Sequence, residues 1–199
     1  MMRANSHDDI LKSALALFAQ KGYDAVSPND VCALAGIKKP TLYHFFGSKE
    51  GLLEELLREQ YGRLDDVIET ACVYIPDPGN YENDVKPALI KTANALFDFA
   101  TKNREFYAYC MALGCAPPKS VPAVVSERYR PRHLEILTGM FFHISGTHPN
   151  MGGREAAYAA RFLALINSQI ASWLKGLAEL NETEAGSIVR GFLHGIYNR

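Results

Sequence analysis

The sequence lacks the features of a membrane protein or a disulfide-stabilised protein. No run approaches 18 uncharged apolar residues, so we expect no transmembrane helix. The first residues, MMRANSHDD, contain no apolar stretch, so we expect no signal peptide and a cytoplasmic protein. The four cysteines show no C-x-x-C spacing, and in that compartment reduced thiols are expected rather than a disulfide framework.

Catalytic motifs are also missing. There is no Gly-rich phosphate loop and no G-x-S-x-G. Four residues are of types that bind metal ions: His133, Glu135, His143 and His148. Their spacing matches neither H-x-x-x-H nor H-E-x-x-H. Cys110 and Cys115 could act as a thiol sensor, although five residues apart on one helix they would lie on different faces. We therefore expect no catalytic residue, no metal and no cofactor, with a metal- or thiol-dependent enzyme or redox sensor as the alternative.

The apolar residues that are present recur at helical spacing. Hydrophobic residues make up 48% and charged residues 22% of the 199 positions, as in globular chains, and no segment alternates as a strand does. These patterns predict an all-α fold of about nine helices. Residues 49–72 form a long connecting helix, residues 75–87 and 145–153 are loops, and the last two helices span 154–180 and 183–197.

Residues 27–53, SPNDVCALAGIKKPTLYHFFGSKEGLL, predict two short helices around a tight turn. Ser27 and Asp30 form a capping box, Gly36 ends the first helix, and Pro40 lies in the first turn of the second. Helices of about two turns are stable only if they share a core. That core is predicted from these residues and from an upstream helix: Val31, Cys32, Ala35, Ile37, Leu42 and Phe45, with Ile10, Leu11, Ala14, Leu15 and Phe18. This is the layout of a helix-turn-helix reader of duplex DNA.

Positive charge is concentrated where such a reader would meet DNA. Residues 1–53 hold six Lys/Arg against five Asp/Glu, but residues 31–49 hold three lysines and no acid. We expect groove contacts from Lys38, Lys39 and Thr41, because a threonine methyl and hydroxyl suit base edges. The remaining predicted DNA contacts are Ser27, Pro40, Tyr43, His44 and Lys49. Few contacts from one reader imply weak binding, which favours a dimer on a palindromic site.

The segment AGIKKPTLYHFFGSKEGLL resembles the DNA-binding signature of the TetR (tetracycline-repressor) family, with ALALFAQKGYDAVSPNDV matching the helix before it. The resemblance covers roughly residues 7–57. It implies a transcriptional regulator, usually a repressor, that binds DNA as a homodimer and is released by a small-molecule effector. It also implies a DNA-binding domain at 1–48 and an effector-binding and dimerisation domain at 49–199. The family often has Ser-Lys-Gly where this chain has residues 38–40, so no operator sequence is inferred.

The resemblance implies a four-helix dimer interface formed by the last two helices of each subunit. Apolar stripes on these helices supply the predicted interface: Phe162, Ile166, Ile170, Ile188, Val189, Phe192 and Ile196. An intramolecular core is the alternative for these positions.

A ligand pocket is likewise implied by the resemblance. The middle of the chain is rich in aromatic residues, which core packing also explains. The candidate lining residues are Asn94, Phe97, Phe106, Tyr109, Met111, Phe142, His143, Gln169 and Trp173, with Asn167 as a further polar group. Such a lining would suit an apolar or aromatic effector.

Overall fold

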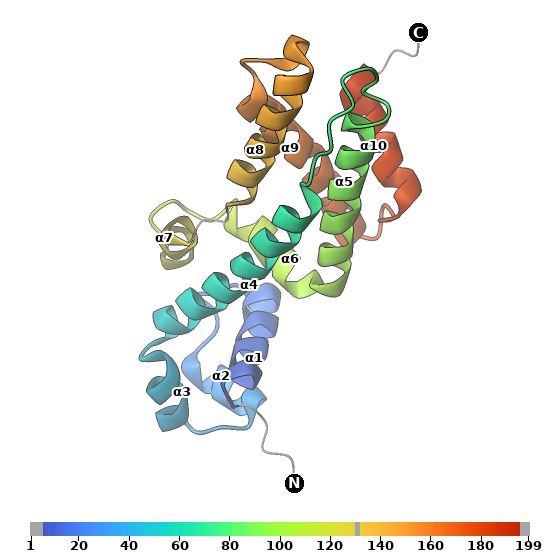
Figure 1. Cartoon of the computed structure of the whole chain (residues 1–199). Helices are drawn as coiled ribbons and strands as arrows, with labels where there is room; N and C mark the ends of the chain where they lie inside the picture. Colours follow the sequence, from blue (N-terminus) through green and yellow to red (C-terminus); the bar gives the residue numbers. More distant parts are fainter. Residues whose placement is uncertain (1–5, 130–131, 196–199) are drawn as a thin grey trace. The chain divides into compact units, whose positions relative to one another are not determined.

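The computed structural model describes residues 6–129 and 132–195, and all regular structure in these ranges is helical (Figure 1). The predicted all-α class is therefore confirmed. Ten α-helices and one 3₁₀ turn are described, against about nine expected. The helix that the sequence did not predict is α7 (Val121–Arg128). Its Pro122 lies in the first turn of the helix, where a missing N–H is tolerated.

The chain divides into two compact units, residues 1–62 with 103–130 and residues 63–102 with 131–199. Within the described residues, no helix combines the length and the apolar character needed to cross a bilayer. The expected functional boundary at residue 48 does not coincide with the division into compact units. The helix α4 contributes to both units, and two later helices belong to the first unit. That boundary stays a prediction.

The first unit contains α1 (Ser6–Lys21), α2 (Pro28–Ala35), α3 (Lys39–Phe46), the start of α4 (Lys49–Ala71), α6 (Arg104–Leu113) and α7. α1 contacts both α2 and α6, and α2 contacts α3. Its centre is formed by fully buried side chains, among them Ile10, Ala14, Phe18, Val31 and Leu42. The three-helix core predicted for the reader is thus present.

One predicted core residue of this unit is wrong. Phe45 is 44% exposed, and Phe46 is buried instead. Phe46 follows Leu42 by four residues and therefore shares its inward face, whereas Phe45 lies at the edge of that face. Both adjacent phenylalanines are apolar, so the sequence alone does not show which one is buried. The orientation of α3 about its own axis decides that.

The second unit contains the rest of α4, α5 (Val85–Lys102), α8 (His133–Thr147), η1 (Pro149–Met151), α9 (Glu155–Leu174) and α10 (Glu182–His194). α8 packs along α9, and α5 contacts both α9 and α10 (Figure 1). α9 ends earlier than predicted, because the chain turns through Gly176 with φ of 73°. Of the predicted last helix, residues 196 and 197 lie outside the described residues.

Candidate nucleic-acid interface

The start of α2 is fixed by a reciprocal cap between Ser27 and Asp30. The Asp30 backbone N–H donates to Ser27 Oγ at 3.3 Å, and the Ser27 backbone N–H donates to Asp30 Oδ2 at 2.7 Å. The Ser27 hydroxyl also donates to Asp30 Oδ2 at 2.6 Å, and these bonds lower the pKa of the Asp30 carboxyl. The predicted capping box is confirmed. The Ser27 hydroxyl proton is engaged by Asp30, so a DNA phosphate would have to compete for it.

The turn between the two helices depends on Gly36. Its φ of 67° is left-handed, and a Cβ there would meet no atom within 4 Å, so the requirement is conformational rather than steric. The chain then continues through extended Lys38 into α3, with Pro40 in the first helical turn. Both features agree with the sequence prediction. The left-handed conformation of Gly36 and the fixed φ of Pro40 thus determine where α3 begins and in which direction it leaves the turn.

The outward face of α3 carries most of the predicted DNA contacts. Lys39 and Tyr43 lie four residues apart, as do Pro40 and His44, so these four side chains form two adjacent rows. All four are exposed, as is Lys38, while Thr41 is half-buried. The inward face of the same helix holds Leu42 and Phe46 in the core. The structure therefore gathers the predicted α3 residues on the side of the helix that faces away from the core.

Lys49 is placed differently from the α3 residues. Its ammonium lies 4.0 Å from the centroid of the Tyr23 ring, a cation–π distance. Partial burial lowers the pKa of Lys49, and the nearby Asp24 carboxylate opposes that shift. The Ser48 hydroxyl oxygen accepts the backbone N–H of Gly51 at 2.9 Å and caps α4 beside it. Tyr23 was not among the predicted DNA contacts, although it lies in the segment ALALFAQKGYDAVSPNDV that resembles the family.

His7 is a second residue that the sequence analysis missed. Its ring centroid lies 5.0 Å from that of Phe46 and 5.7 Å from that of Phe45, so it packs against the end of α3. Ligand atoms of His7, Glu55 and Glu59 lie within 4.8 Å of one another. Arg58 donates two hydrogen bonds to the Glu55 carboxylate, at 2.9 and 2.5 Å. The group braces α1 against α4, and only the crossing of these helices reveals it.

The residues of the alternative metal and thiol hypotheses do not assemble as a site. Among the described residues, no three of His133, Glu135, His143 and His148 bring their ligand atoms together. His148 pairs with Asp84, with 2.8 Å between Nε2 and Oδ2, while His143 is exposed on α8. Burial raises the pKa of the Cys110 thiol to about 12, although a hydrogen bond with Tyr61 opposes the shift. Cys115 is exposed and lies beyond the end of α6. A thiol with a raised pKa carries little reactive thiolate, which disfavours a redox sensor.

The predicted pocket residues do not lie in one unit. Phe106, Tyr109 and Met111 belong to α6 of the first unit, and the other candidates belong to the second unit: Asn94, Phe97, Phe142, His143, Gln169 and Trp173. Phe97, Phe106 and Tyr109 are buried core residues. Phe142 is 58% exposed and His143 is also exposed, and their assignment to a pocket lining stays a prediction. Phe142 lies on the side of α8 opposite the buried Met140 and Ile144.

Most of the predicted dimer-interface residues face the core of their own protomer. Phe162, Ile166, Ile170 and Val189 are fully buried, so their assignment to an interface is wrong. The half-buried Phe192 has its ring centroid 5.3 Å from that of Phe162 and 5.9 Å from that of Phe141. Ile188 is also half-buried, and Ile196 lies outside the described residues. The apolar stripes were correctly recognised, but they pack α9 and α10 into the second unit.

Comparison with protein families identifies part of the first unit. Residues 10–56 match the family model described as bacterial regulatory proteins, tetR family. The chain is 38% identical over 72 residues to the HTH-type transcriptional repressor KstR2 of Mycolicibacterium smegmatis, a match that covers 34% of this chain and 35% of that protein. The chain spans between a third and a half of the length of the curated relatives that it matches.

Solved structures extend the likeness to the whole chain. The TetR family transcriptional regulator PfmR from Thermus thermophilus matches with a TM-score of 0.73 and 25% identity, covering 100% of both chains. The transcriptional regulator FadR from Bacillus subtilis, solved in complex with stearoyl-CoA, matches with a TM-score of 0.75 and 16% identity, covering 96% of this chain and 99% of that one. At 16% identity, the similarity to FadR shows a shared fold and nothing more.

Proposed function

Since the chain belongs to the TetR family, we propose that it is a DNA-binding transcriptional regulator, most simply a repressor, that acts as a homodimer on a palindromic operator. A regulator of this kind acts by binding DNA and an effector, so we propose no enzymatic activity. We also propose that it is located in the cytoplasm, where the DNA is. The functional boundary of the reader is proposed at residue 48.

The observation that carries this proposal is the outward face of α3. It presents Lys38, Lys39, Tyr43 and His44 to solvent, on a helix whose other face is fixed in a core. No acidic residue occurs between Val31 and Lys49, so this stretch of the sequence carries only positive charge. A rigid, exposed helix with this charge suits the major groove of B-DNA.

The proposed contacts have two roles. Lys38, Lys39 and Thr41, around the start of α3, read base edges. Phosphates are held by Tyr43 and His44 from the exposed rows of α3 and by Lys49 at the start of α4, where the N-terminal backbone N–H groups also favour an anion. Pro40 shapes the tip of α3, and Ser27 at the start of α2 adds a further phosphate contact.

We propose that the dimer forms through the exposed sides of α9 and α10. A shallow groove there is lined by Tyr158, Arg161, Ala164, Leu165, Gly191 and Phe192. Leu165 is 43% exposed, and the small Ala164 and Gly191 let another helix approach closely. A second copy of the same groove would complete a four-helix interface by two-fold symmetry. One reader makes few contacts, so pairing two readers supplies both affinity and symmetry.

We further propose that a small molecule bound in the second unit controls DNA affinity. The helix α4 is continuous from Lys49 to Ala71 and contributes to both units, so it can transmit a change. The effector must bind better to the form that does not bind DNA, and by reciprocity DNA must weaken effector binding by the same factor. Coupling on the order of 1–3 kcal/mol is the expected scale.

Selection of bound duplexes from a random pool tests the proposed function. We expect enrichment of an inverted repeat whose half-site centres lie about 34 Å apart, or a multiple of that distance. Affinity for the selected duplex should fall steeply with salt. The matched control is the variant Lys38→Glu/Lys39→Glu, which reverses the charge at the start of α3. Failure to enrich any duplex, or equal binding by this variant, would overturn the proposal.

A further inference from the structure

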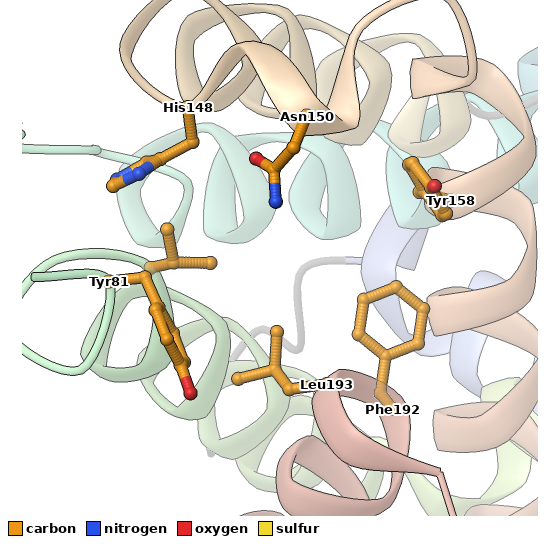
Figure 2. A pocket seen from close by; sticks show the side chains of 7 residues that line it. Tyr81, His148, Asn150, Tyr158, Phe192 and Leu193 are labelled. Carbon is orange, nitrogen blue, oxygen red and sulfur yellow. The ribbon is translucent and has the colours of Figure 1, made fainter.

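The second unit contains a pocket that the sequence analysis did not predict. Figure 2 shows its lining from α5, α9, α10, the end of α8 and the segments beside them: Tyr81, Val85, His148, Asn150, Tyr158, Phe192 and Leu193. Its volume is about 370 Å³, within the range of small-molecule sites. The lining combines an apolar floor with a few polar groups, as ligand pockets commonly do.

A buried carboxylate stands behind this pocket. The Asp84 side chain has no exposed surface, and it accepts hydrogen bonds from the Tyr74 hydroxyl at 2.5 Å and the Asp77 backbone N–H at 2.9 Å. The Val85 backbone N–H and His148 Nε2 also contact it, at 2.6 and 2.8 Å. Burial alone would raise the pKa of Asp84, but these hydrogen bonds outweigh it and hold the pKa at about 2.

Asp84 thereby orients the imidazole of His148. Because Asp84 is ionised, Nε2 of His148 carries the proton that they share. The other ring nitrogen, Nδ1, is then a hydrogen-bond acceptor on a side chain that lines the pocket and is 14% exposed. When a carboxylate binds there, Nδ1 takes up one proton, from the acid itself or from solvent, and the imidazolium then lies between the carboxylate of Asp84 and the carboxylate of the ligand.

The rest of the lining suits the remainder of such a molecule. Figure 2 shows the Asn150 amide reaching into the space between His148 and Tyr158, where its NH₂ group can donate to a second carboxylate oxygen. Across that space, Phe192 and Leu193 of α10 offer apolar surface. His148 and Asn150 therefore lie across the pocket from Phe192 and Leu193.

We propose that this pocket binds an apolar or aromatic carboxylic acid, with the carboxylate at His148 and Asn150 and the apolar body against Phe192 and Leu193. The assignment of this ligand as the effector rests on the proposed function. Binding the acid fills a space between α5, α9 and α10 and so ties three helices of the second unit together.

The test uses three probes of one shape and different charge: 2-naphthoate, 2-naphthylmethanol and 2-naphthylmethylamine. Isothermal titration of the full chain should give affinity for naphthoate about tenfold above that for the alcohol, and higher still above that for the amine. Equal affinity for the amine and the acid, or no naphthoate binding at millimolar concentration, would overturn the proposal.

Three variants locate the site. Leu193→Trp fills the apolar end and should abolish naphthoate binding, whereas Leu177→Trp, on a residue that is 77% exposed and does not line the pocket, should leave it unchanged. His148→Gln retains a donor for Asp84 but removes Nδ1, so it should weaken naphthoate about tenfold and weaken the alcohol by a smaller factor. Undiminished naphthoate binding by Leu193→Trp would place the site elsewhere.

A further variant covers the case in which Leu193→Trp fails to fold. Asn150→Leu changes an exposed side chain, and it should reduce the preference for naphthoate over the alcohol. An unchanged preference in Asn150→Leu and His148→Gln together would overturn the assignment.

DNA binding is measured separately, with and without naphthoate, on the selected duplex. Naphthoate binding by a chain that binds no duplex would support the pocket and refute the proposed function. Duplex binding without naphthoate binding would support the proposed function and refute the pocket assignment. If naphthoate binds and leaves duplex affinity unchanged, the effector role of the pocket is overturned.

Discussion

The ammonium of Lys49 lies 4.0 Å from the centre of the Tyr23 ring, which joins the start of α4 to the turn between α1 and α2. The Tyr23 ring in turn lies 5.3 Å from that of Phe18, whose side chain belongs to the core. A flexible lysine is thereby held by a fixed aromatic surface, and its positive charge is left for an anion. The proposed phosphate contact of Lys49 is in this way prepared before DNA arrives.

The first prediction concerns this lysine itself. Lys49→Ala should weaken binding to all duplexes by a similar factor, about 1–2 kcal/mol, because a phosphate contact carries no base information. The slope of affinity against salt should fall by about one unit per subunit. Fluorescence anisotropy over a salt series measures both, with Lys12→Ala on the exposed side of α1 as the charge control. An unchanged affinity and slope would remove Lys49 from the interface.

A second prediction separates the ring of Tyr23 from its hydroxyl. Tyr23→Leu should weaken duplex binding by about 0.5–1 kcal/mol, since the lysine loses its aromatic support. Tyr23→Phe retains the ring and should bind as the wild type does. Combining Tyr23→Leu with Lys49→Ala should add little to Lys49→Ala alone, because the two residues act through one contact. Full additivity of the two losses would contradict this coupling.

Base reading is expected from the tip of α3. Lys39→Ala or Thr41→Ala should change the preferred base at one position in each half-site, symmetrically, at a cost of about 1–3 kcal/mol for the original base. Repeating the random-pool selection with each variant measures the change. A uniform loss across all sequences would reassign these residues to phosphate positioning.

The pKa of Asp84, held at about 2, predicts how stability depends on pH. A carboxyl with a lowered folded-state pKa stabilises the protein above its unfolded pKa, and this contribution is lost as pH falls from about 4 through about 2. At neutral pH the contribution is on the order of 2 kcal/mol. Urea unfolding at several pH values should show Asp84→Asn less stable at pH 7 and less sensitive to acid. Asp98→Asn, on the exposed side of α5, is the control. An Asp84→Asn variant with the wild-type acid response would refute the prediction.

The proposed dimer face is best tested at Leu165. Replacing Phe192 with arginine would disturb the protomer itself, because its ring contacts those of Phe141, Tyr158 and Phe162. Leu165→Arg places a charge on the exposed side of α9 and should yield folded monomers that bind the operator at least about tenfold more weakly. Ile75→Arg, at a position that is 77% exposed in a loop, should remain dimeric. Sedimentation velocity distinguishes the outcomes, and an intact Leu165→Arg dimer would move the interface elsewhere.

Much of the reader was predictable because its signals are local. The cap of α2 depends on residues three apart, the turn on one left-handed glycine, and the start of α3 on a proline in its first turn. Such features involve neighbouring backbone atoms, so the residue types suffice to predict them. The exposure of Lys39 and Tyr43 then follows from helical periodicity once Leu42 faces the core.

The second unit shows what periodicity leaves undecided. The apolar stripes of α9 and α10 are the same whether they pack within one protomer or against another, because burial depends on where neighbouring helices lie. Only the tertiary structure places Phe162 and Val189 in the protomer core and leaves Leu165 outside.

By itself, the sequence determined the helical class, the local geometry of the reader and the charge of its outward face. The tertiary structure decided which residues meet across long separations, such as Asp84 with His148 and Lys49 with Tyr23. The physical reason is that a cap or turn is formed by neighbours in the chain, whereas a pocket or an aromatic support forms only when helices cross. Crossings depend on the packing of whole faces, which no short motif specifies.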